Sequence, residues 1–211
     1  MRPTLLVSCL LPFALVGTAW SAPELMTNGG FEAPTVSTLS CFQNNNSNGW
    51  TSFGPGANVG SCFVPSGAVS GALTFPLSHT GSQLLLVNNQ EFVGTKIAQN
   101  VSLTAGVPYQ LTFSMAGVTG DATNLGLTVT LAGVGSQTFT SPAGTTWSDK
   151  VWNFTPTTTG SPIISFTATA GYVNLDSLSL QSPVPEASQA AMLAAGVAVM
   201  LLAVRRRSMV R

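Results

Sequence analysis

The sequence predicts an all-β fold, an antiparallel β-sandwich of the jelly-roll kind, with a signal peptide before it and one transmembrane helix after it. Three observations predict the sandwich. Beyond Gly81, short runs alternate between apolar and polar residues, as half-buried strands do. Turn residues separate these runs at intervals of roughly ten residues. No stretch between Glu24 and Gln181 has a helical period.

The expected strands fill the second half of the central domain, residues 22–181. Residues 33–80 are rich in Asn, Ser, Gly and Pro, and we expect them to be mostly loop. In the last strand the apolar alternation changes phase at Asp176 and Ser177, which predicts a β-bulge there. The expected strands are 83–88, 95–103, 109–116, 125–131, 136–140, 150–154, 163–169 and 173–180.

Charge is scarce and unevenly spread. Of 211 residues 45% are hydrophobic and 7% are charged, whereas a soluble domain averages about 25% charged residues. Residues 22–183 contain two lysines and six acidic residues, so this segment has a net charge of −4, although the whole chain is neutral. Without a Lys/Arg patch in the central chain, nucleic acid is excluded as a partner. The apolar content also excludes a disordered charged tail.

Residues 1–21 have the pattern of a secretory signal peptide. Arg2 supplies the positive start, and residues 5–16 form the apolar stretch. Small residues then allow cleavage after Ala19 or after Ser21. We therefore expect the domain that follows to be exported.

Residues 187–204 predict a transmembrane helix. They are apolar apart from Ser188 and Gln189, and as a helix they would span about 27 Å, close to the ~30 Å hydrocarbon core of a bilayer. The cluster Arg205, Arg206 and Arg207 follows directly, and such a cluster stays on the cytoplasmic side. The domain would then lie outside the cytoplasmic membrane. The alternative is a C-terminal core helix, but this segment has no polar face.

The motif Val184-Pro185-Glu186-Ala187 stands just before this helix. Residues 182–211 resemble the PEP-CTERM sorting signal. They contain, in that order at the chain end, a Pro-Glu motif, a short spanning helix and a basic cluster (205–211). The resemblance implies that an exosortase processes the tail. Exosortases are transpeptidase-like cysteine enzymes in the membrane of Gram-negative bacteria, and these bacteria usually make exopolysaccharide. Before processing the protein would be anchored in the cytoplasmic membrane; afterwards it would be at the cell surface or outside. Ala187 departs from the motif, whose third position is usually Pro.

A second resemblance covers the central domain. LMTNGGFE (25–32) opens the domain, VNLDSLSL (173–180) closes it, and GVPYQLTF (106–113) lies between them. This ordered set resembles the galactose-binding-domain-like jelly rolls, which include many carbohydrate-binding modules. In those relatives a first-strand Glu and a last-strand Asp often help to hold a structural calcium ion, so the resemblance implies this role for Glu32 and Asp176. The alternative is that both acids are solvated strand ends.

Two cysteines, Cys41 and Cys62, remain once the signal peptide with Cys9 is removed. An even number in an exported domain favours a disulfide bond. The alternative, a metal-binding pair, lacks histidine partners, since His79 is the one histidine of the chain.

No catalytic pattern is present, and we expect no enzyme. The sequence has no nucleophile elbow, no metalloprotease motif and no phosphate-binding loop. His79 lies in a turn-like stretch and is expected at the surface, and Asp121 and Asp149 have no partner along the chain. A hydrolase would require carboxylates that converge only in the fold.

Trp50 is the best candidate for binding a sugar ligand. It follows an Asn-rich stretch, and sugar sites combine aromatic faces with amide and hydroxyl groups. The alternative for Trp50 is a buried packing role, and Trp147 and Trp152 are expected to face the core. We therefore expect a non-catalytic exported protein that is associated with exopolysaccharide and binds glycans. The first alternative is a structural or adhesive surface protein without sugar binding.

Overall fold

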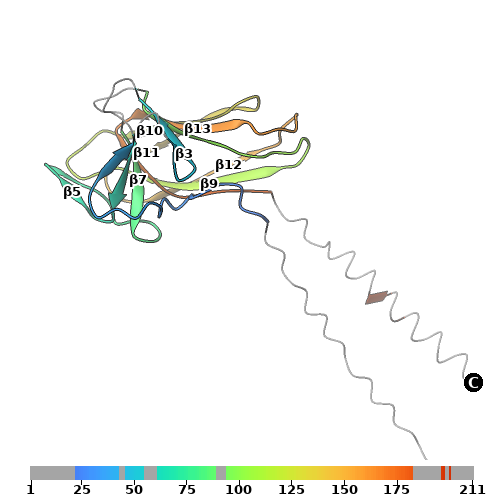
Figure 1. The fold of residues 1–211 in the computed structure, drawn as a ribbon, viewed down its shortest axis with the longest axis horizontal. Coiled ribbons are helices and arrows are strands. Elements are labelled where there is room, and N and C mark those ends of the chain that lie inside the picture. The colour runs from blue at the N-terminus through green and yellow to red at the C-terminus, as the bar shows by residue number, and fades with distance from the viewer. Residues whose placement is uncertain are drawn as a thin grey trace, which may run out of the picture.

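The computed structural model describes residues 22–42, 46–54, 61–88 and 94–182, together with Gly196, Val197 and Met200. Two six-stranded antiparallel sheets pack face to face (Figure 1). This confirms the predicted antiparallel β-sandwich.

Sheet A contains, in spatial order, β1 (Ser40–Phe42), β4 (Ser61–Pro65), β7 (Gln83–Asn88), β14 (Tyr172–Gln181), β9 (Tyr109–Ala116) and β12 (Ser148–Phe154). Sheet B contains β11 (Gly135–Ser141), β10 (Leu125–Leu131), β13 (Ile163–Ala170), β8 (Lys96–Asn100), β3 (Trp50–Phe53) and β2 (Asn46–Ser47). A small hairpin joins β5 (Val69–Ser70) and β6 (Leu73–Thr74).

All eight expected strands are present, as β7 to β14, with ends that differ by at most a few residues. The predicted bulge is present too: β14 shifts register against β9 between Asp176 and Ser179, and Ser177 has a positive φ of 55°. The expectation that residues 33–80 are mostly loop was wrong in part, because β1 to β6 lie there. These strands are two to five residues long, too short for alternation to reveal them.

The main core lies between the two sheets. Alternation in β9 buries Tyr109, Leu111, Phe113 and Met115. Phe113 meets Phe166 of sheet B edge-on, with ring centroids 5.8 Å apart. The same alternation on the facing strands fills the space between the sheets, as a sandwich requires.

A second, smaller apolar cluster covers part of the outer face of sheet A. Val64 of β4 and Leu86 of β7 point away from the main core and are buried beneath Phe75. The segment 66–80, which carries the β5–β6 hairpin, therefore acts as a cover over one end of sheet A.

Cys41 and Cys62 form a disulfide bond, which confirms the predicted pairing. They lie directly opposite each other in the register of β1 and β4. The bond therefore fastens the edge strand of sheet A to its neighbour.

The predictions for the chain ends fall outside the described residues. This holds for the signal peptide (1–21), the motif 184–187, the arginine cluster and most of the helix 187–204. Within that helix, Gly196, Val197 and Met200 are described and are helical. The described part of the chain includes no helix that is long and apolar enough to cross a membrane.

Candidate functional site

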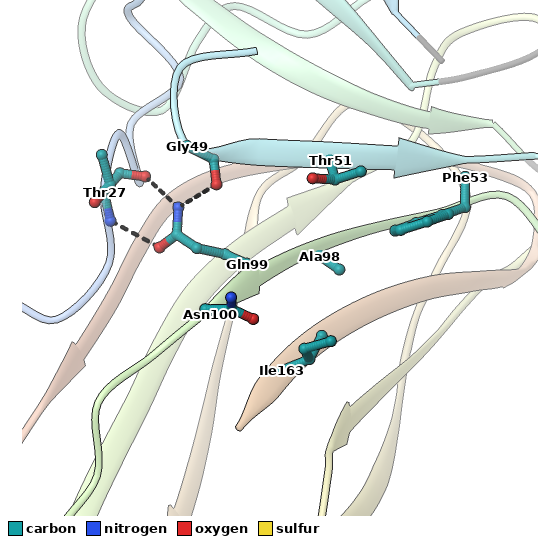
Figure 2. Close-up of a pocket in the computed structure, with 8 residues that line it drawn as sticks. All are labelled: Thr27, Gly49, Thr51, Phe53, Ala98, Gln99, Asn100 and Ile163. Atoms are coloured by element: carbon teal, nitrogen blue, oxygen red, sulfur yellow. Dashed lines mark hydrogen bonds between the residues drawn. The ribbon is translucent and has the colours of Figure 1, made fainter. Parts of the chain in front are cut away.

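A groove of about 390 Å³ opens on the outer face of sheet B. Figure 2 shows it between β3, β8 and the start of β13, with the N-terminal segment at one end. Its lining residues are Thr27, Gly49, Thr51, Phe53, Ala98, Gln99, Asn100 and Ile163.

Strand alternation builds the floor of the groove. In β3, Trp50 and Ser52 are buried, while Thr51 and Phe53 are not, so the latter two point outward. Thr51 pairs with Ala98 of β8. Because alanine has a short side chain, the sheet surface is hollow at this point, between bulkier neighbours.

Phe53 supplies an aromatic surface at one end of the groove. Phe53 is 39% exposed, and its ring extends over the groove beside Ala98 (Figure 2). The ammonium of Lys96 lies 5.2 Å from the ring centroid, a cation–π contact that helps to hold the ring in place.

Gln99 fixes the opposite end. Its Oε1 accepts a hydrogen bond from the Thr27 amide at 2.8 Å, and its Nε2 donates to the Thr27 and Gly49 carbonyls at 3.0 and 2.9 Å (Figure 2). The side chain is 7% exposed, and these bonds satisfy its buried amide. The N-terminal segment is therefore held against sheet B as a wall of the groove, beside the exposed Asn100.

The chemistry of the groove suits binding. None of its eight lining residues is ionisable, so the lining itself offers no general acid, base or charged nucleophile. It offers an aromatic ring, an aliphatic side chain in Ile163, hydroxyls and an exposed amide. Such a mixture of apolar surface with a few polar groups is typical of small-molecule binding sites.

Trp50 is not part of this surface, and its prediction as a ligand residue was wrong. The side chain is fully buried, its Nε1 donates to the Asn28 carbonyl at 3.1 Å, and its ring packs against Phe31 and Phe166. The alternative, a packing role, is confirmed. Trp50 was preferred to the nearby Phe53 because strand β3 was not predicted. With β3 known, the spacing of three residues places Trp50 and Phe53 on opposite faces.

Asp176 is fully buried, so it is no solvated strand end. Its Oδ2 accepts hydrogen bonds from the His79 and Thr80 amides at 2.8 and 3.0 Å. Its Oδ1 accepts from the Ser177 amide and the Thr80 hydroxyl at 2.6 and 3.1 Å. Burial raises the pKa of this carboxyl, and the hydrogen bonds from these donors partly offset the rise.

Glu32 holds the next part of the same loop. Its Oε1 accepts hydrogen bonds from the Ser82 and Gln83 amides at 3.0 and 3.1 Å, and its Oε2 accepts from the Ser82 hydroxyl at 2.7 Å. Gly81, at a φ of 64°, passes so close that any side chain there would collide with this carboxylate.

These contacts give Glu32 and Asp176 a role in holding the loop that needs no calcium ion. Calcium binds through carboxylate lone pairs, whereas both carboxylates here already accept hydrogen bonds from N–H and O–H groups of residues 79–83. Throughout the described ranges, no three His, Cys, Asp or Glu side chains are grouped to hold a metal ion. The loop is held by hydrogen bonds to the two carboxylates.

His79 belongs to a polar cluster on the outer face of sheet A. Its Nδ1 lies 3.0 Å from the Ser177 hydroxyl, and its Nε2 lies 3.8 Å from Oδ1 of Asp149. The Ser114 hydroxyl donates to the same Asp149 oxygen at 2.6 Å. The side chain of His79 is 36% exposed, which agrees with the predicted surface position.

This cluster does not form a glycosidase pair. Asp149 and Asp176 flank Ser114 in the strand register, so two carboxylates do approach each other across the sheet. Asp176, however, is fully buried and surrounded by donors to both of its oxygens. A glycosidase needs both carboxyl groups beside the scissile bond, and Asp176 has no surface to offer a substrate.

The fold and the groove together define an all-β sandwich with a groove, lined by uncharged residues, on the outer face of one sheet. The chain belongs to the family described as "Protein of unknown function (DUF642)", whose sequence profile matches residues 24–172. No curated protein is significantly similar in sequence.

Several solved structures are similar to this chain over part of its length. One is the enzymatically active domain of the bacteriophage CBA120 tailspike protein 4, with a TM-score of 0.49 and 13% identity over 75% of this chain and 21% of the tailspike chain. Another is a family 61 carbohydrate-binding module in complex with β-1,4-galactotriose, with a TM-score of 0.47 and 18% identity over 76% of this chain and 99% of the module. A third is the xylan-binding domain CBM22-1 of Paenibacillus barcinonensis Xyn10C, with a TM-score of 0.45 and 14% identity over 78% of this chain and 97% of that domain. All three TM-scores lie below 0.5, so no conclusion about this chain rests on these similarities.

Proposed function

We propose that this protein is an exported, non-catalytic protein that binds glycans through the groove on sheet B. The observation that carries the proposal is the lining: Phe53, Thr51 and Asn100 supply a ring, a hydroxyl and an amide, and none of the eight lining residues is ionisable.

The chemistry of sugars matches this lining. The C–H groups of a pyranose ring form an apolar face that packs on an aromatic ring, while sugar hydroxyls both donate and accept hydrogen bonds. Phe53 takes the first role. Thr27, Thr51 and Asn100 have side chains that take the second.

The test is a glycan array followed by titration calorimetry with the full chain in mild detergent. We expect binding to at least one polysaccharide, and a loss of about tenfold or more in affinity for Phe53→Ala, because an apolar contact with a ring of this size is worth ~1.5–3 kcal/mol. Val151→Ala is the matched control, since Val151 is 49% exposed on the other sheet. An array without any bound glycan would favour the structural or adhesive role, and equal binding by Phe53→Ala would remove the groove from the proposal.

We also propose that residues 182–211 make the protein a substrate of an exosortase, which delivers it to the cell surface or beyond, in association with exopolysaccharide. The support is the order of Val184-Pro185-Glu186-Ala187, an apolar segment and three arginines at the chain end.

The sorting proposal is tested in a bacterium that carries an exosortase. We expect the wild-type chain to be shortened and released, and Glu186→Ala to remain full-length in the membrane fraction. Glu24→Ala, a charge-matched change in the domain, should be processed as wild type. Wild-type processing of Glu186→Ala, or of the wild-type chain in a strain without the exosortase, would contradict the proposal.

A further inference from the structure

Beside the groove, the outer face of sheet B is a continuous array of hydroxyl side chains. Strands β10, β11 and β13 lie between the groove and the edge of the sheet. Wherever an outward position on these strands has a polar side chain, the residue is Ser or Thr, and none of these residues is buried. We refer to them as the hydroxyl face: Thr128, Thr130, Ser136, Thr138, Thr140, Ser165, Thr167 and Thr169.

The strand register joins the hydroxyl face to the groove in two rows. The first row runs from Phe53 through Lys96 to the hydroxyl residues of β13, β10 and β11, and the second runs from Thr51 through Ala98 to the hydroxyl residues of the same strands. The hydroxyl members are Thr167, Thr128 and Thr138 in the first row and Ser165, Thr130 and Ser136 in the second. Each row therefore begins at a groove residue and crosses to the far edge of the sheet.

The hydroxyl face contains no carboxylate. Among the described residues, the acids that pair with strands lie elsewhere: Asp149 and Asp176 are in sheet A, and Glu24 bonds to Ser179 and Leu180 of β14. The one charge in the two rows is the ammonium of Lys96, which lies over Phe53.

We propose that the groove and the hydroxyl face together bind an extended, uncharged linear polysaccharide laid across the strands of sheet B. This rests on the proposed glycan binding and names the class of glycan. From β3 to β11 the rows cross four strand spacings of ~4.8 Å each, about 19 Å in all. A chain end or a single sugar would occupy the groove alone, whereas a surface of this length matches several consecutive sugar units.

The hydroxyl chemistry selects a neutral chain. A Ser or Thr hydroxyl both donates and accepts, so it pairs with a sugar hydroxyl in either direction. Thr128 and Thr138 illustrate this pairing, since their hydroxyls lie 3.0 Å apart. A polyanionic chain would need several cations, and along the two rows Lys96 is the sole candidate.

The competing explanation is that these residues only keep a charge-poor domain soluble. Solubility would be served equally by charged residues, as on β12 of sheet A, where Asp149 and Lys150 are adjacent. The two explanations differ in one measurable respect, because a solubilising face has no influence on affinity for a glycan.

The experiment compares ligand length by titration calorimetry of the full chain. The probes are cello-, xylo- and β-1,4-galacto-oligosaccharides of two to six units, with oligogalacturonates of the same lengths as the charged counterpart. The variant is Thr128→Val with Thr138→Val, which keeps the branched shape and removes both members of the hydrogen-bonded pair. Thr112→Val, on the outer side of β9 in sheet A, is the control, and a melting curve verifies that each variant is folded.

We expect affinity to rise with length for a neutral series, and the double variant to weaken binding of the hexamer by about five- to tenfold, since each lost hydrogen bond is worth ~0.5–1.5 kcal/mol. Binding of the dimer should change by less than about twofold. If the dimer binds as tightly as the hexamer, if the double variant equals wild type, or if oligogalacturonate binds more tightly, the extended neutral chain is ruled out. In those cases a loss of binding in Phe53→Ala would still support glycan binding in the groove. If the wild type binds no probe and no glycan on the array, both the glycan-binding proposal and the proposal of an extended neutral chain are ruled out.

Discussion

Sheet A and sheet B each contain six strands and bury an apolar inner face, yet their outer faces differ in cover and in charge. Segment 66–80 lies over one end of sheet A, and a buried carboxylate, Asp176, anchors its last two residues, His79 and Thr80. Among the described residues, nothing covers the groove on the outer face of sheet B in this way, and this face presents hydroxyls, one ring and one ammonium. The contacts that stabilise a loop and the proposed binding surface therefore lie on different outer faces of one sandwich.

The difference follows from side-chain chemistry. On sheet A, outward Leu84 and Leu86 require an apolar cover, because exposed apolar surface is costly in water. On sheet B, the outward side chains of the hydroxyl face are mostly Thr, which is common in strands, and the hydroxyls of Thr and Ser need no apolar cover. Substitutions on the two faces should thus affect different measurements.

The sharpest test lies within one strand. Trp50 and Phe53 both belong to β3 but face opposite ways. We expect Trp50→Ala to lower the free energy of unfolding by about 3–5 kcal/mol through the cavity it leaves, and Phe53→Ala by less than about 1 kcal/mol. Urea denaturation measures both. Similar losses for the two variants would show that the faces are not divided in this way.

The next largest effect concerns the edge of sheet A. Replacing Cys41 and Cys62 by serine should cost about 3 kcal/mol, because the disulfide closes a loop of some twenty residues in the unfolded chain. Reduction of the wild type serves as the control and should give a similar loss. The groove lies on the other sheet, so the folded double variant should keep its glycan affinity; a parallel loss of affinity would contradict the separation.

The loop held by the two carboxylates offers a third test. Glu32→Ala removes three hydrogen bonds to Ser82 and Gln83 and should lower stability by about 1–2 kcal/mol, given their partial exposure. A calcium chelator should leave the melting temperature of the wild type unchanged. A drop on chelation that added calcium reverses would instead restore the calcium role of Glu32 and Asp176.

The smallest effect depends on pH. Burial raises the pKa of Glu24, but hydrogen bonds from Ser179, Leu180, Met26 and Gln181 outweigh it, so the pKa lies below its ordinary value. The contribution of Glu24 is therefore present above the ordinary pKa of glutamate and is lost as pH falls through the lowered folded pKa.

Thermal melts of wild type and Glu24→Gln from about pH 6 to about pH 3 measure this contribution. The stability difference should stay below about 1 kcal/mol, because solvent screens an exposed carboxylate, and should shrink on acidification. The raised pKa of Asp176 acts in the opposite direction, but it is present in both proteins and cancels. A difference that grows toward low pH would contradict the assignment.

The sequence was sufficient for the long strands and insufficient for the groove. Strands such as β9 and β10 are seven or eight residues long, so alternation marks them, and the phase change at Asp176 marked the bulge. Strand β3 has four residues and owes its place to pairing with β8, which is distant in sequence. Its faces, and hence the roles of Trp50 and Phe53, could not be read without that pairing.

The hydrogen bonds of Glu24 have a mechanical consequence. The Leu25 amide donates to the Leu180 carbonyl at 3.0 Å, and Glu24 binds the same end of β14, so the domain begins and ends at one place. A force applied through the tail acts first on Gln181, the last residue of β14. Strand β14 lies between β7 and β9 in the interior of sheet A. A force along this strand must shear hydrogen bonds on both of its sides at once, whereas an edge strand would peel away bond by bond. A protein tethered by its C-terminal end would thus carry load through the interior of the sheet.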